Sequence, residues 1–456
     1  MKAREFADQV CATLGKSGFQ AFLVGGCVRD ILLKREPEDY DVATDATPEQ
    51  IEELFPHTLD IGARFGVIVV IEDPQDAAAA KVEVATFRSD RSYSDGRHPD
   101  GVTYSKTPQQ DVARRDFTIN ALLFDPATGE VLDLVGGRED LRDGVIRAIG
   151  QAERRFGEDK LRMLRAVRFA ARFGYTIEPN TMAAIQNLAA EIHQVSAERV
   201  RDELTKILTE GSARRGFELL DATGLLVQVL PEIARMKGVQ QPAQFHPEGD
   251  VWQHTLMMLG MLEAGTSKTL AWGVLLHDVG KPPTFTPPSG PNGRIRFDRH
   301  VEVGVKMAEE IGRRFRFSNE DTEQVALLVM NHMRFKDVPA MKPATLKRFA
   351  RLDRFREHLE LHRLDCLSSH RNLDNYKALE RFLAETPPEQ VAPARLLTGE
   401  DLIGLGFRPG PRFKEILTAV EDAQLNGSIQ DTAEAQRFVV EQYGSGDGHS
   451  KRAEDT

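Results

Sequence analysis

The stretch at residues 23–48 constrains the fold most, because it joins a short apolar run, a Gly-Gly turn, a helical segment and a second short run that carries Asp39 and Asp41. Side chains of an extended segment alternate between its two faces, so Asp39 and Asp41 point the same way. Two carboxylates on one face suit Mg²⁺, which prefers oxygen ligands. Gly25 and Gly26 lack a Cβ and let the backbone approach a phosphate, and helix N–H groups favour an anion. Together these features predict metal-assisted phosphoryl or nucleotidyl transfer.

This stretch resembles the signature of the tRNA nucleotidyltransferase and bacterial poly(A) polymerase superfamily, whose head domain is similar to that of DNA polymerase beta. Taken singly, a Gly-Gly turn is usually just a turn and an Asp-x-Asp pair is usually a solvated loop, so their order within one unit carries the resemblance. It implies that the aspartates hold two Mg²⁺ ions and that a nucleoside triphosphate binds beside the turn. The matching residues are Gly25, Gly26, Arg29, Asp30, Asp39 and Asp41.

Residues 81–88 (KVEVATFR) alternate like a strand and place Glu83 and Ala85 on one face. If this strand neighbours the one that carries Asp39 and Asp41, Glu83 becomes a third catalytic carboxylate. The resemblance places the third acidic residue of the family similarly. An isolated glutamate in a strand would more often face solvent.

Residues 88–102 are polar and rich in turn-forming residues, so we expect a mobile loop there. The composition alone would also suit a plain linker. The run at residues 93–99 nevertheless resembles the flexible loop of full CCA-adding enzymes.

Residues 114–122 (RRDFTINAL) resemble the next motif of the superfamily. Arg115, like the arginine before it, offers guanidinium donors for triphosphate oxygens. Asp116 and Asn120 are four residues apart, so on a helix they would share one side and orient ribose hydroxyls or metal-bound phosphates. This run is therefore expected to bind the nucleotide.

Residues 158–174 show the apolar spacing of a helix and end at Gly174, a favourable helix cap. On the polar side, Asp159 and Arg162 are three residues apart and can point together. A carboxylate accepts from an exocyclic amine and a guanidinium donates to a ring nitrogen. One such pair can accept cytosine and adenine, while uracil and guanine leave buried groups unsatisfied. Charge statistics alone would favour a simple ion pair between the two.

The run at residues 158–162 coincides with the protein-templating motif of the class II CCA-adding enzymes, and the match extends through Phe169. The helix expected at residues 196–208 resembles the motif that braces the templating helix. The resemblance thus adds four polar residues to the nucleotide site, namely Asp159, Arg162, Arg165 and Arg168.

A second candidate site lies within residues 246–365. An apolar run ends in adjacent His277 and Asp278 before a Gly-Lys turn, and histidine with carboxylate suits a transition metal better than Mg²⁺. A single buried histidine is generally a satisfied core residue, but the whole order resembles the HD-superfamily phosphohydrolases. A vestigial site that only packs against the body stays open as the alternative. The implied metal ligands are His254, His277, Asp278, His300, His332 and Asp365.

Charge and composition limit the partners and the compartment. The formal net charge of -11 argues against indiscriminate binding of nucleic acid, but not against RNA held at one basic concavity. No apolar run approaches the ~20 residues that span a bilayer, so we expect no membrane association. The charged N-terminal run makes a poor secretory signal. The chain has only three cysteines, widely spaced, which favours reduced thiols in the cytoplasm.

We therefore expect an α+β chain of several domains, because it is too long for one core. A polymerase-beta-like nucleotidyltransferase head with a mixed or antiparallel sheet and helices should precede all-α neck, body and tail domains. The expected ranges are 1–150 for the head, 151–240 for the nucleotide-selecting and RNA-binding neck, 241–375 for the HD body, 376–443 for the tail and 444–456 for a disordered end.

The resemblance implies template-independent addition of CCA, from CTP and ATP, to the 3′ end of tRNA by two-metal nucleotidyl transfer. It also implies that the acceptor region of the tRNA is gripped by shape and phosphate contacts, and that the HD domain adds a metal-dependent phosphohydrolase activity. A poly(A) polymerase, or an enzyme specialised for A or CC addition, stays open within the superfamily. From other classes, an HD phosphohydrolase with a nucleotide-binding head and a non-catalytic RNA-binding module stay open. The sequence does not determine the oligomeric state.

Overall fold

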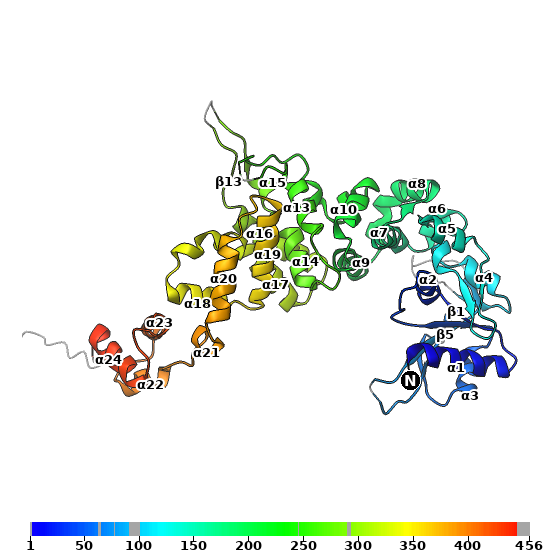
Figure 1. Ribbon diagram of the computed structural model, residues 1–456, viewed down its shortest axis with the longest axis horizontal. Helices are drawn as coiled ribbons and strands as arrows, with labels where there is room; N and C mark the ends of the chain where they lie inside the picture. Colours follow the sequence, from blue (N-terminus) through cyan, green and yellow to red (C-terminus); the bar gives the residue numbers. More distant parts are fainter. Residues whose placement is uncertain are drawn as a thin grey trace, which may run out of the picture. The chain divides into compact units, whose positions relative to one another are not determined.

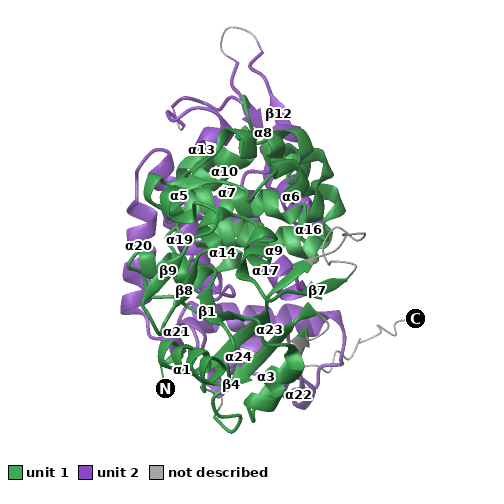
Figure 2. Ribbon diagram, turned by 90° about the vertical axis from the view of Figure 1, so that its right-hand side faces the viewer, with its two compact units in different colours: residues 1–239, 255–272, 311–317 green, residues 240–254, 273–310, 318–456 purple. Residues whose placement is uncertain are grey.

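The computed structural model describes residues 2–62, 65–76, 78–90, 101–244, 246–289 and 293–444, which form the strands and helices of Figure 1. Their contacts divide the chain into two units (Figure 2). Unit 1 comprises residues 1–239, 255–272 and 311–317, and unit 2 comprises residues 240–254, 273–310 and 318–456. Residues 91–100 of the predicted loop, and all of the predicted disordered end except Gly444, lie outside the described residues.

Unit 1 begins with a seven-stranded sheet in the order β3-β4-β5-β2-β1-β8-β9. The β2–β5 pair is parallel and the other pairs of this sheet are antiparallel. Helix α1 (Ala3–Lys16) packs on β1, β2 and β5 through an apolar stripe that includes Val10 and Leu14. The predicted mixed sheet with helices is confirmed. Its strands are β1 (Ala21–Val24), β2 (Asp41–Thr44), β3 (Thr58–Gly62), β4 (Val67–Ile71), β5 (Lys81–Thr86), β8 (Leu123–Asp125) and β9 (Glu130–Leu132).

The strand register brings two of the predicted acidic residues together, whereas Asp39, expected on the same strand as Asp41, lies just before β2. Val24 of β1 pairs with Asp41 of β2, and Asp41 pairs with Glu83 of β5. The strand predicted to carry Glu83 is therefore confirmed, and it is the neighbour of β2, which meets the condition set for a third carboxylate. Helix α2 (Gly26–Leu32) starts directly after the turn that ends β1, and α3 (Pro48–Leu54) follows β2.

One loop prediction and one helix prediction in unit 1 are corrected. The ends of the loop expected at residues 88–102 pair as strands β6 (Arg88–Asp90) and β7 (Val102–Tyr104), because the ladder satisfies their backbone groups. Only Thr118–Asn120 of the helix expected near Asp116 is helical, and it is a short 3₁₀ turn that follows α4 (Pro108–Ala113).

The start of the helix predicted at residues 158–174 is also corrected, because that range forms only α7 (Leu161–Phe173), and Glu158 ends a separate helix, α6 (Ala152–Glu158). Asp159 between them is extended, with φ −147° and ψ 107°. Its Oδ1 accepts the N–H of Leu161 at 3.0 Å, which satisfies a free donor at the start of α7. Gly174 ends α7 in the left-handed region at φ +70°, as predicted.

The rest of unit 1 is mainly helical, with α9 packed against α7. Strands β10 (Val145–Ile146) and β11 (Thr176–Ile177) form a parallel pair beside these helices. The helices are α5 (Gly137–Asp143), α8 (Pro179–Leu188), η3 (Ala189–Gln194), α9 (Ala197–Thr209), α10 (Ala213–Ala222), α11 (Leu225–Val229) and α12 (Pro231–Ala234).

Beyond residue 250 the described chain is helical apart from a small hairpin of β12 (Phe285–Thr286) and β13 (Arg296–Phe297). One apolar cluster of unit 2 includes Phe335, Phe349 and Val391, and a separate cluster fills the last helices. The helices are α13 (Val251–Leu259), α14 (Lys268–Leu276), α15 (Lys281–Thr284), α16 (His300–Arg314), α17 (Asn319–Asn331), η4 (His332–Ala340), α18 (Pro343–Ala350), α19 (Phe355–Ser368), α20 (Asp374–Glu385), α21 (Pro388–Val391), α22 (Gly399–Gly404), α23 (Pro411–Leu425) and α24 (Thr432–Tyr443).

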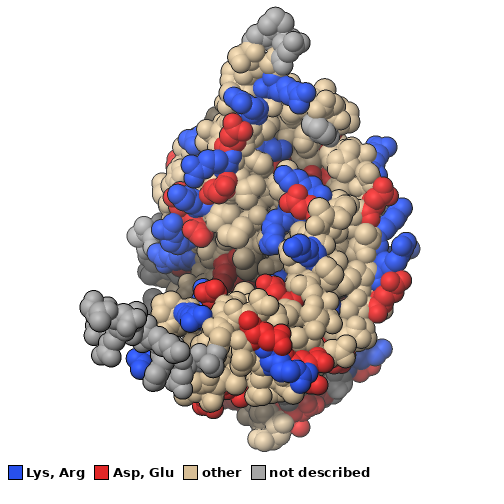
Figure 3. Space-filling model, turned by 90° about the vertical axis from the view of Figure 1, so that its left-hand side faces the viewer, with Lys and Arg blue, Asp and Glu red and all other residues tan. Residues whose placement is uncertain are grey.

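Charged side chains are mixed over the face of the molecule drawn in Figure 3, where Lys and Arg are interspersed with Asp and Glu. The excess of negative charge is therefore not gathered into one acidic field on that face. No helix within the described segments is both long and apolar enough for a membrane span.

Candidate active sites

The glycine turn of the head lies against a carboxylate and a guanidinium. Gly25 has φ +82°, a conformation that L side chains rarely adopt. A Cβ at this position would lie 3.6 Å from Nη1 of Arg115 and 3.7 Å from Oδ2 of Asp41. The turn predicted for a phosphate is therefore beside the aspartate predicted for a metal.

The three acidic residues of the head influence one another. Burial, together with the negative charges of Asp39 and Glu83, raises the pKa of Asp41 to about 7, although Arg115 acts in the opposite direction. Asp39 and Asp41 line a cavity of about 630 Å³, whereas Glu83 is not one of its described lining residues. In the described part of the chain, the three do not bring their oxygens within 4.8 Å of one another as a group. The carboxylates thus share a charge environment rather than a closed ligand set.

The cavity beside Asp41 collects the residues that the sequence predicted for nucleotide binding. Its walls come from the turn before α2, the segment after α4, and helices α7 and α9. Arg199, Lys206 and Glu210 of the α9 region also line it, and the sequence analysis did not single them out. The predicted residues in its lining are Gly25, Gly26, Arg29, Asp30, Arg115, Asp116, Asn120, Asp159, Arg162, Arg165 and Arg168.

Two arginines of the cavity are held by one carboxylate that the sequence analysis missed. Asp111 of α4 is fully buried. It accepts from Nε and Nη2 of Arg114 at 2.9 and 2.6 Å, and from Nε and Nη2 of Arg115 at 3.1 and 3.0 Å. Burial raises the pKa of Asp111, but the two guanidinium groups outweigh it and leave the pKa below its ordinary value. Spacing could have suggested Asp111, since it precedes the arginines by three and four residues.

A chain of hydrogen bonds joins the head to α7. Asn120 Nδ2 donates to Asp116 Oδ1 at 3.2 Å, and Arg29 Nη1 donates to Asn120 Oδ1 at 2.7 Å. Arg165 of α7 donates to Asp116 Oδ2 from Nε at 2.9 Å and from Nη2 at 2.7 Å. Asp116 and Asn120 therefore meet without a helix, and both have protein partners that fix their side chains in the cavity wall.

The two residues predicted to select the base have separate partners. Asp159 accepts from Nη1 and Nη2 of Arg199 at 3.2 and 2.7 Å. Arg162 donates to Glu158 Oε2 at 2.9 Å and to two backbone carbonyls. The described contacts include no ion pair between Asp159 and Arg162, so the simple i,i+3 pair left open by the sequence is not formed. Both side chains instead line the cavity.

Helix α9 braces α7, as the sequence predicted. Arg168 of α7 is buried and donates from Nε to Glu203 Oε2 at 2.7 Å. Its guanidinium also lies over the ring of Phe169, 4.3 Å from the centroid. These contacts fix the helix that carries the selecting residues.

The second predicted site is assembled within unit 2. His254 belongs to α13, His277 and Asp278 follow α14, and Asp365 belongs to α19. Nε2 of His254 lies 3.2 Å from Asp365 Oδ1, and Nε2 of His277 lies 3.1 Å from Asp278 Oδ2. His332 completes the cluster with Nε2 at 3.8 Å from Asp278 Oδ1. Residues far apart in the sequence thus converge.

The ligand atoms of this site form two groups that share Asp278. One group is His254, His277 and Asp278, the other is Asp278, His300 and His332, and within each the candidate ligand atoms lie within 4.8 Å. A third group that meets the same limit, His246, Glu248 and His254, shares His254 with the first. The Nε2 atoms of the four histidines in the first two groups are buried and make no hydrogen bond to the described residues. Those of His254 and His277 lie within ion-pair distance of Asp365 and Asp278, and this convergence of buried nitrogens and carboxylates fits a metal centre.

Charge within the cluster also suits a cation. Burial raises the pKa of Asp278, but Lys281 and the neighbouring histidines lower it well below its ordinary value. Lys281 Nζ lies 2.7 Å from Asp278 Oδ2. Burial lowers the pKa of His332 to about 4, so this imidazole is neutral at neutral pH. Burial also lowers the pKa of His254, but Asp365 and Glu248 outweigh it and raise that pKa to about 9 when no cation is bound.

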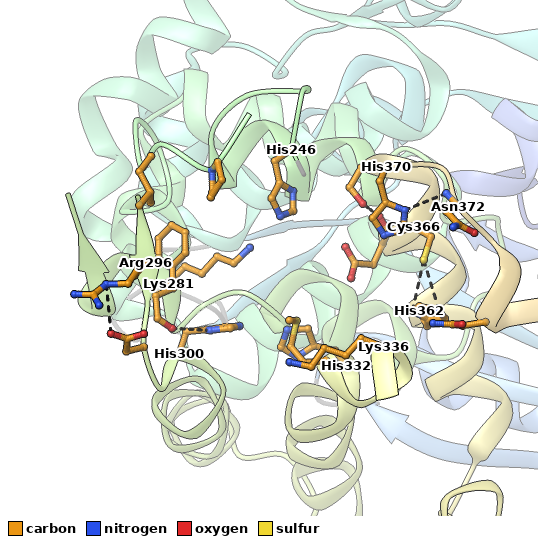
Figure 4. A pocket seen from close by; sticks show the side chains of 18 residues that line it. His246, Lys281, Arg296, His300, His332, Lys336, His362, Cys366, His370 and Asn372 are labelled. Atoms are coloured by element: carbon orange, nitrogen blue, oxygen red, sulfur yellow. Dashed lines mark hydrogen bonds and ion pairs between the residues drawn. The ribbon is translucent and has the colours of Figure 1, made fainter. Parts of the chain in front are cut away.

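A cavity of about 850 Å³ opens beside this cluster. Figure 4 shows His246, His300 and His332 around it, with Lys281 and Arg296 on one side and His362, Cys366 and His370 on the other. A cavity of this size accommodates a small organic ligand next to the histidine cluster.

Comparisons with known proteins agree with both sites. Three protein families match successive parts of the chain. They are described as "Poly A polymerase head domain" (residues 21–147), "Probable RNA and SrmB- binding site of polymerase A" (residues 174–237) and "HD domain" (residues 251–362). The CCA-adding enzyme of Leuconostoc mesenteroides is 43% identical over 218 residues, which span 47% of this chain and 53% of that enzyme. The CCA-adding enzyme of Geobacillus sp. (strain WCH70) is 30% identical over 431 residues, 93% of each chain. The crystal structure of Bacillus stearothermophilus CCA-adding enzyme in complex with CTP is 27% identical with TM-score 0.73, covering 97% of this chain and 98% of that one.

Proposed function

This chain belongs to the CCA-adding enzymes, which are nucleotidyltransferases, and we propose that it adds CMP, CMP and AMP, from CTP and ATP, to the 3′ end of tRNA. The observation that carries the proposal is one cavity lined by the glycine turn, by Asp39 and Asp41, and by Asp159 and Arg162. In this proposal the turn binds the phosphates, the aspartate pair binds metal and the Asp159–Arg162 pair selects the base, all around one cavity of about 630 Å³. The solved relative in complex with CTP supports CTP as a substrate.

In the proposed reaction the 3′-hydroxyl of the RNA attacks the α-phosphorus of the nucleotide and pyrophosphate leaves. Asp39 and Asp41, with Glu83 from the neighbouring strand, would hold two Mg²⁺ ions, which supply Lewis-acid stabilisation of the triphosphate when bound. The crowding that raises the pKa of Asp41 supports this role, because a cation relieves repulsion between carboxylates. Gly25 leaves space for a phosphate beside them, and Arg115 donates to its oxygens.

Selection of the base is assigned to Asp159 and Arg162. Arg199 holds Asp159, and Glu158 holds Arg162, so both side chains are fixed before the nucleotide enters. A fixed carboxylate and guanidinium reject uracil and guanine by leaving buried donors and acceptors unpaired. The basic side chains of α7 and α9 would lie along the RNA backbone.

The experiment is incubation of the protein with tRNA that ends before CCA and with each labelled nucleotide. We expect two CMP residues and one AMP, no addition from UTP or GTP, and loss of all addition in Asp41→Asn. Long tracts of AMP with CTP ignored would instead identify a poly(A) polymerase. Addition that stops after CC, or that needs a CC end, would identify a specialised enzyme.

We also propose a metal-dependent phosphohydrolase at the HD site, supported by the four buried Nε2 atoms without hydrogen bonds. The two groups that share Asp278 would hold transition-metal ions, which supply Lewis-acid activation when bound. The adjacent cavity would hold the phosphoester, with Lys281 as a cationic group in its wall.

A pair of variants separates the two sites. His277→Ala should lose metal and cyclic-phosphate hydrolysis while nucleotide addition continues, and Asp39→Ala should show the reverse. A protein that hydrolyses phosphoesters but never extends tRNA would be an HD phosphohydrolase with a nucleotide-binding head. Retention of hydrolysis in His277→Ala would remove the HD proposal.

We infer a cytoplasmic location, because the proposed substrate, tRNA, is matured there. Cys11, Cys27 and Cys366, all within described segments, are buried and free, which supports a reducing compartment. Cell fractionation with an antibody to the chain would check this inference.

A further inference from the structure

Each histidine of the HD site is fixed through Nδ1, which leaves Nε2 facing the cluster. Three of the four use a backbone carbonyl three residues earlier: His277 to Val274 at 2.8 Å, His300 to Phe297 at 2.9 Å and His332 to Val329 at 2.7 Å. His254 differs, because its Nδ1 lies 2.7 Å from Oε1 of Glu248. One ligand is thus oriented by a side chain instead of by its own backbone.

The Glu248 contact dictates which nitrogen of His254 is available. A carboxylate only accepts hydrogen bonds, so Nδ1 of His254 must carry the proton in this pair. In the neutral ring, Nε2 then keeps its lone pair, and it is the atom 3.2 Å from Asp365 and 4.0 Å from Asp278. Such an acceptor on the distal nitrogen fixes both the tautomer and the ring orientation of a metal ligand.

Glu248 acts on a second imidazole at the same time. Its Oε1 lies 2.8 Å from Nδ1 of His246, which lines the cavity beside the cluster (Figure 4). The rings of His246 and His254 meet edge to face, with centroids 5.0 Å apart. One acidic residue therefore sets the orientation of a ligand and of a cavity residue.

The burial of Glu248 indicates a specific role. Its side chain is only 4% exposed, and Oε2 makes no hydrogen bond to the described part of the chain. A buried carboxylate with one unsatisfied oxygen is costly to keep. If Glu248 only connected the segment before α13 to that helix, an apolar side chain at this position would cost less folding free energy.

We propose that Glu248 is a positioning residue of the HD metal centre, which holds Nδ1 of His254 so that Nε2 faces the metal, and which also holds Nδ1 of His246 in the cavity wall. This inference rests on the proposed metal centre. It assigns Glu248 no contact with metal or substrate, and it makes the affinity for the metal depend on a residue outside the ligand set.

The experiment is a Co²⁺ titration of the full chain, followed by visible absorption, in an Asp41→Asn background that removes binding at the head. Glu248→Ala should bind Co²⁺ about 10- to 100-fold more weakly than the background protein, with altered ligand-field bands. Glu248→Gln keeps an acceptor for Nδ1 and should recover most of the affinity and the original bands. Gln253→Ala, which changes an exposed side chain of α13 beside His254, is the matched control and should leave the Co²⁺ affinity unchanged.

Two outcomes would overturn the inference, and they are distinguishable. If His254→Ala loses Co²⁺ while Glu248→Ala keeps the original affinity and bands, Glu248 is only structural, even if its melting temperature falls. If the background protein and His254→Ala bind Co²⁺ equally weakly, the metal centre itself is absent and the inference fails with it. Should Glu248→Ala fail to fold, Glu248→Asp withdraws the oxygen by one methylene and must still weaken binding.

Discussion

Asp41 of β2 lies directly opposite Glu83 of β5 in the parallel pair at the centre of the seven-stranded sheet. Asp39 adds a third negative charge, and burial with these neighbours raises the pKa of Asp41 to about 7. A fold that buries repelling carboxylates is less stable than the same fold with a neutral group there, unless a cation joins them. The acidic site therefore lowers the stability of the folded protein when no metal is bound.

Comparison of the wild type with Asp41→Asn should reveal this loss of stability, because it depends on pH in the wild type only. The pKa of Asp41 is raised from an ordinary 3.8 to about 7 in the folded state, so its contribution to stability is present below about pH 4 and is lost as pH rises to about 7. Without divalent metal, the melting temperature of the wild type relative to Asp41→Asn should fall over that range. Differential scanning calorimetry at several pH values measures it.

The control for this prediction is Glu53→Gln, which removes one exposed negative charge from α3. It should follow the wild type at every pH. Saturating Mg²⁺ should raise the melting temperature of the wild type at pH 8 but not that of Asp41→Asn. A wild type that gains stability relative to Asp41→Asn as pH rises would contradict the arrangement of charges described above.

Gly25→Ala should damage nucleotide binding more than stability. Its φ of +82° costs a side chain about 1–3 kcal/mol, and the added methyl would occupy the space between Arg115 and Asp41. Gly18→Ala is the matched control, because Gly18 has φ +88° with nothing within 4 Å of its Cβ position. Both variants should melt earlier, and only Gly25→Ala should raise KM for CTP and ATP in steady-state assays. Equal KM values in the two variants would remove the turn from the nucleotide site.

Asp111→Asn should weaken nucleotide use without changing base selection. Asp111 holds both Arg114 and Arg115, and hydrogen bonds to charged groups contribute about 1.5–3 kcal/mol, so kcat/KM should fall about 10- to 100-fold for CTP and ATP alike. Asp140→Asn is the control: Asp140 is also buried and accepts from Arg147 and Thr118, but it is not among the described residues of the cavity wall. Loss of stability without a change in kcat/KM in Asp111→Asn would make its role purely structural.

Local patterns in the sequence predicted the elements whose partners are close in the chain. Period-two alternation and the Gly-Gly turn predicted the β1–α2–β2 unit, and the alternation around Glu83 predicted a strand there, whereas only the register shows that this strand pairs with β2. The order of histidines and aspartates predicted six residues that the fold brings together from five helical segments and their ends.

The sequence did not show which distant residues contact the predicted site residues. Arg199 meets Asp159 across 40 positions, which no local spacing reveals. The helix was predicted to start three residues too early, at residue 158, although the carboxylate of Asp159 accepts the N–H of Leu161 and so marks the start of α7. Glu248 was missed for a related reason, because its role depends on where the segment before α13 folds back.

Arg199→Ala carries the strongest consequence of these long-range contacts. Arg199 is the side chain that grips Asp159 through two donors, so its removal frees the carboxylate that should accept from the amine of cytosine or adenine. A mobile carboxylate discriminates less, because it can turn away from a mismatched carbonyl. We expect kcat/KM for CTP and ATP to fall, and the relative use of UTP and GTP to rise by about tenfold or more, which corresponds to ~1.4 kcal/mol of discrimination. Arg201→Ala, on the same helix and bonded to Asp202 and the carbonyl of Arg316, should leave selection intact. Competition assays with labelled nucleotides on tRNA lacking CCA measure the ratio directly, and an unchanged ratio in Arg199→Ala would place base selection outside Asp159.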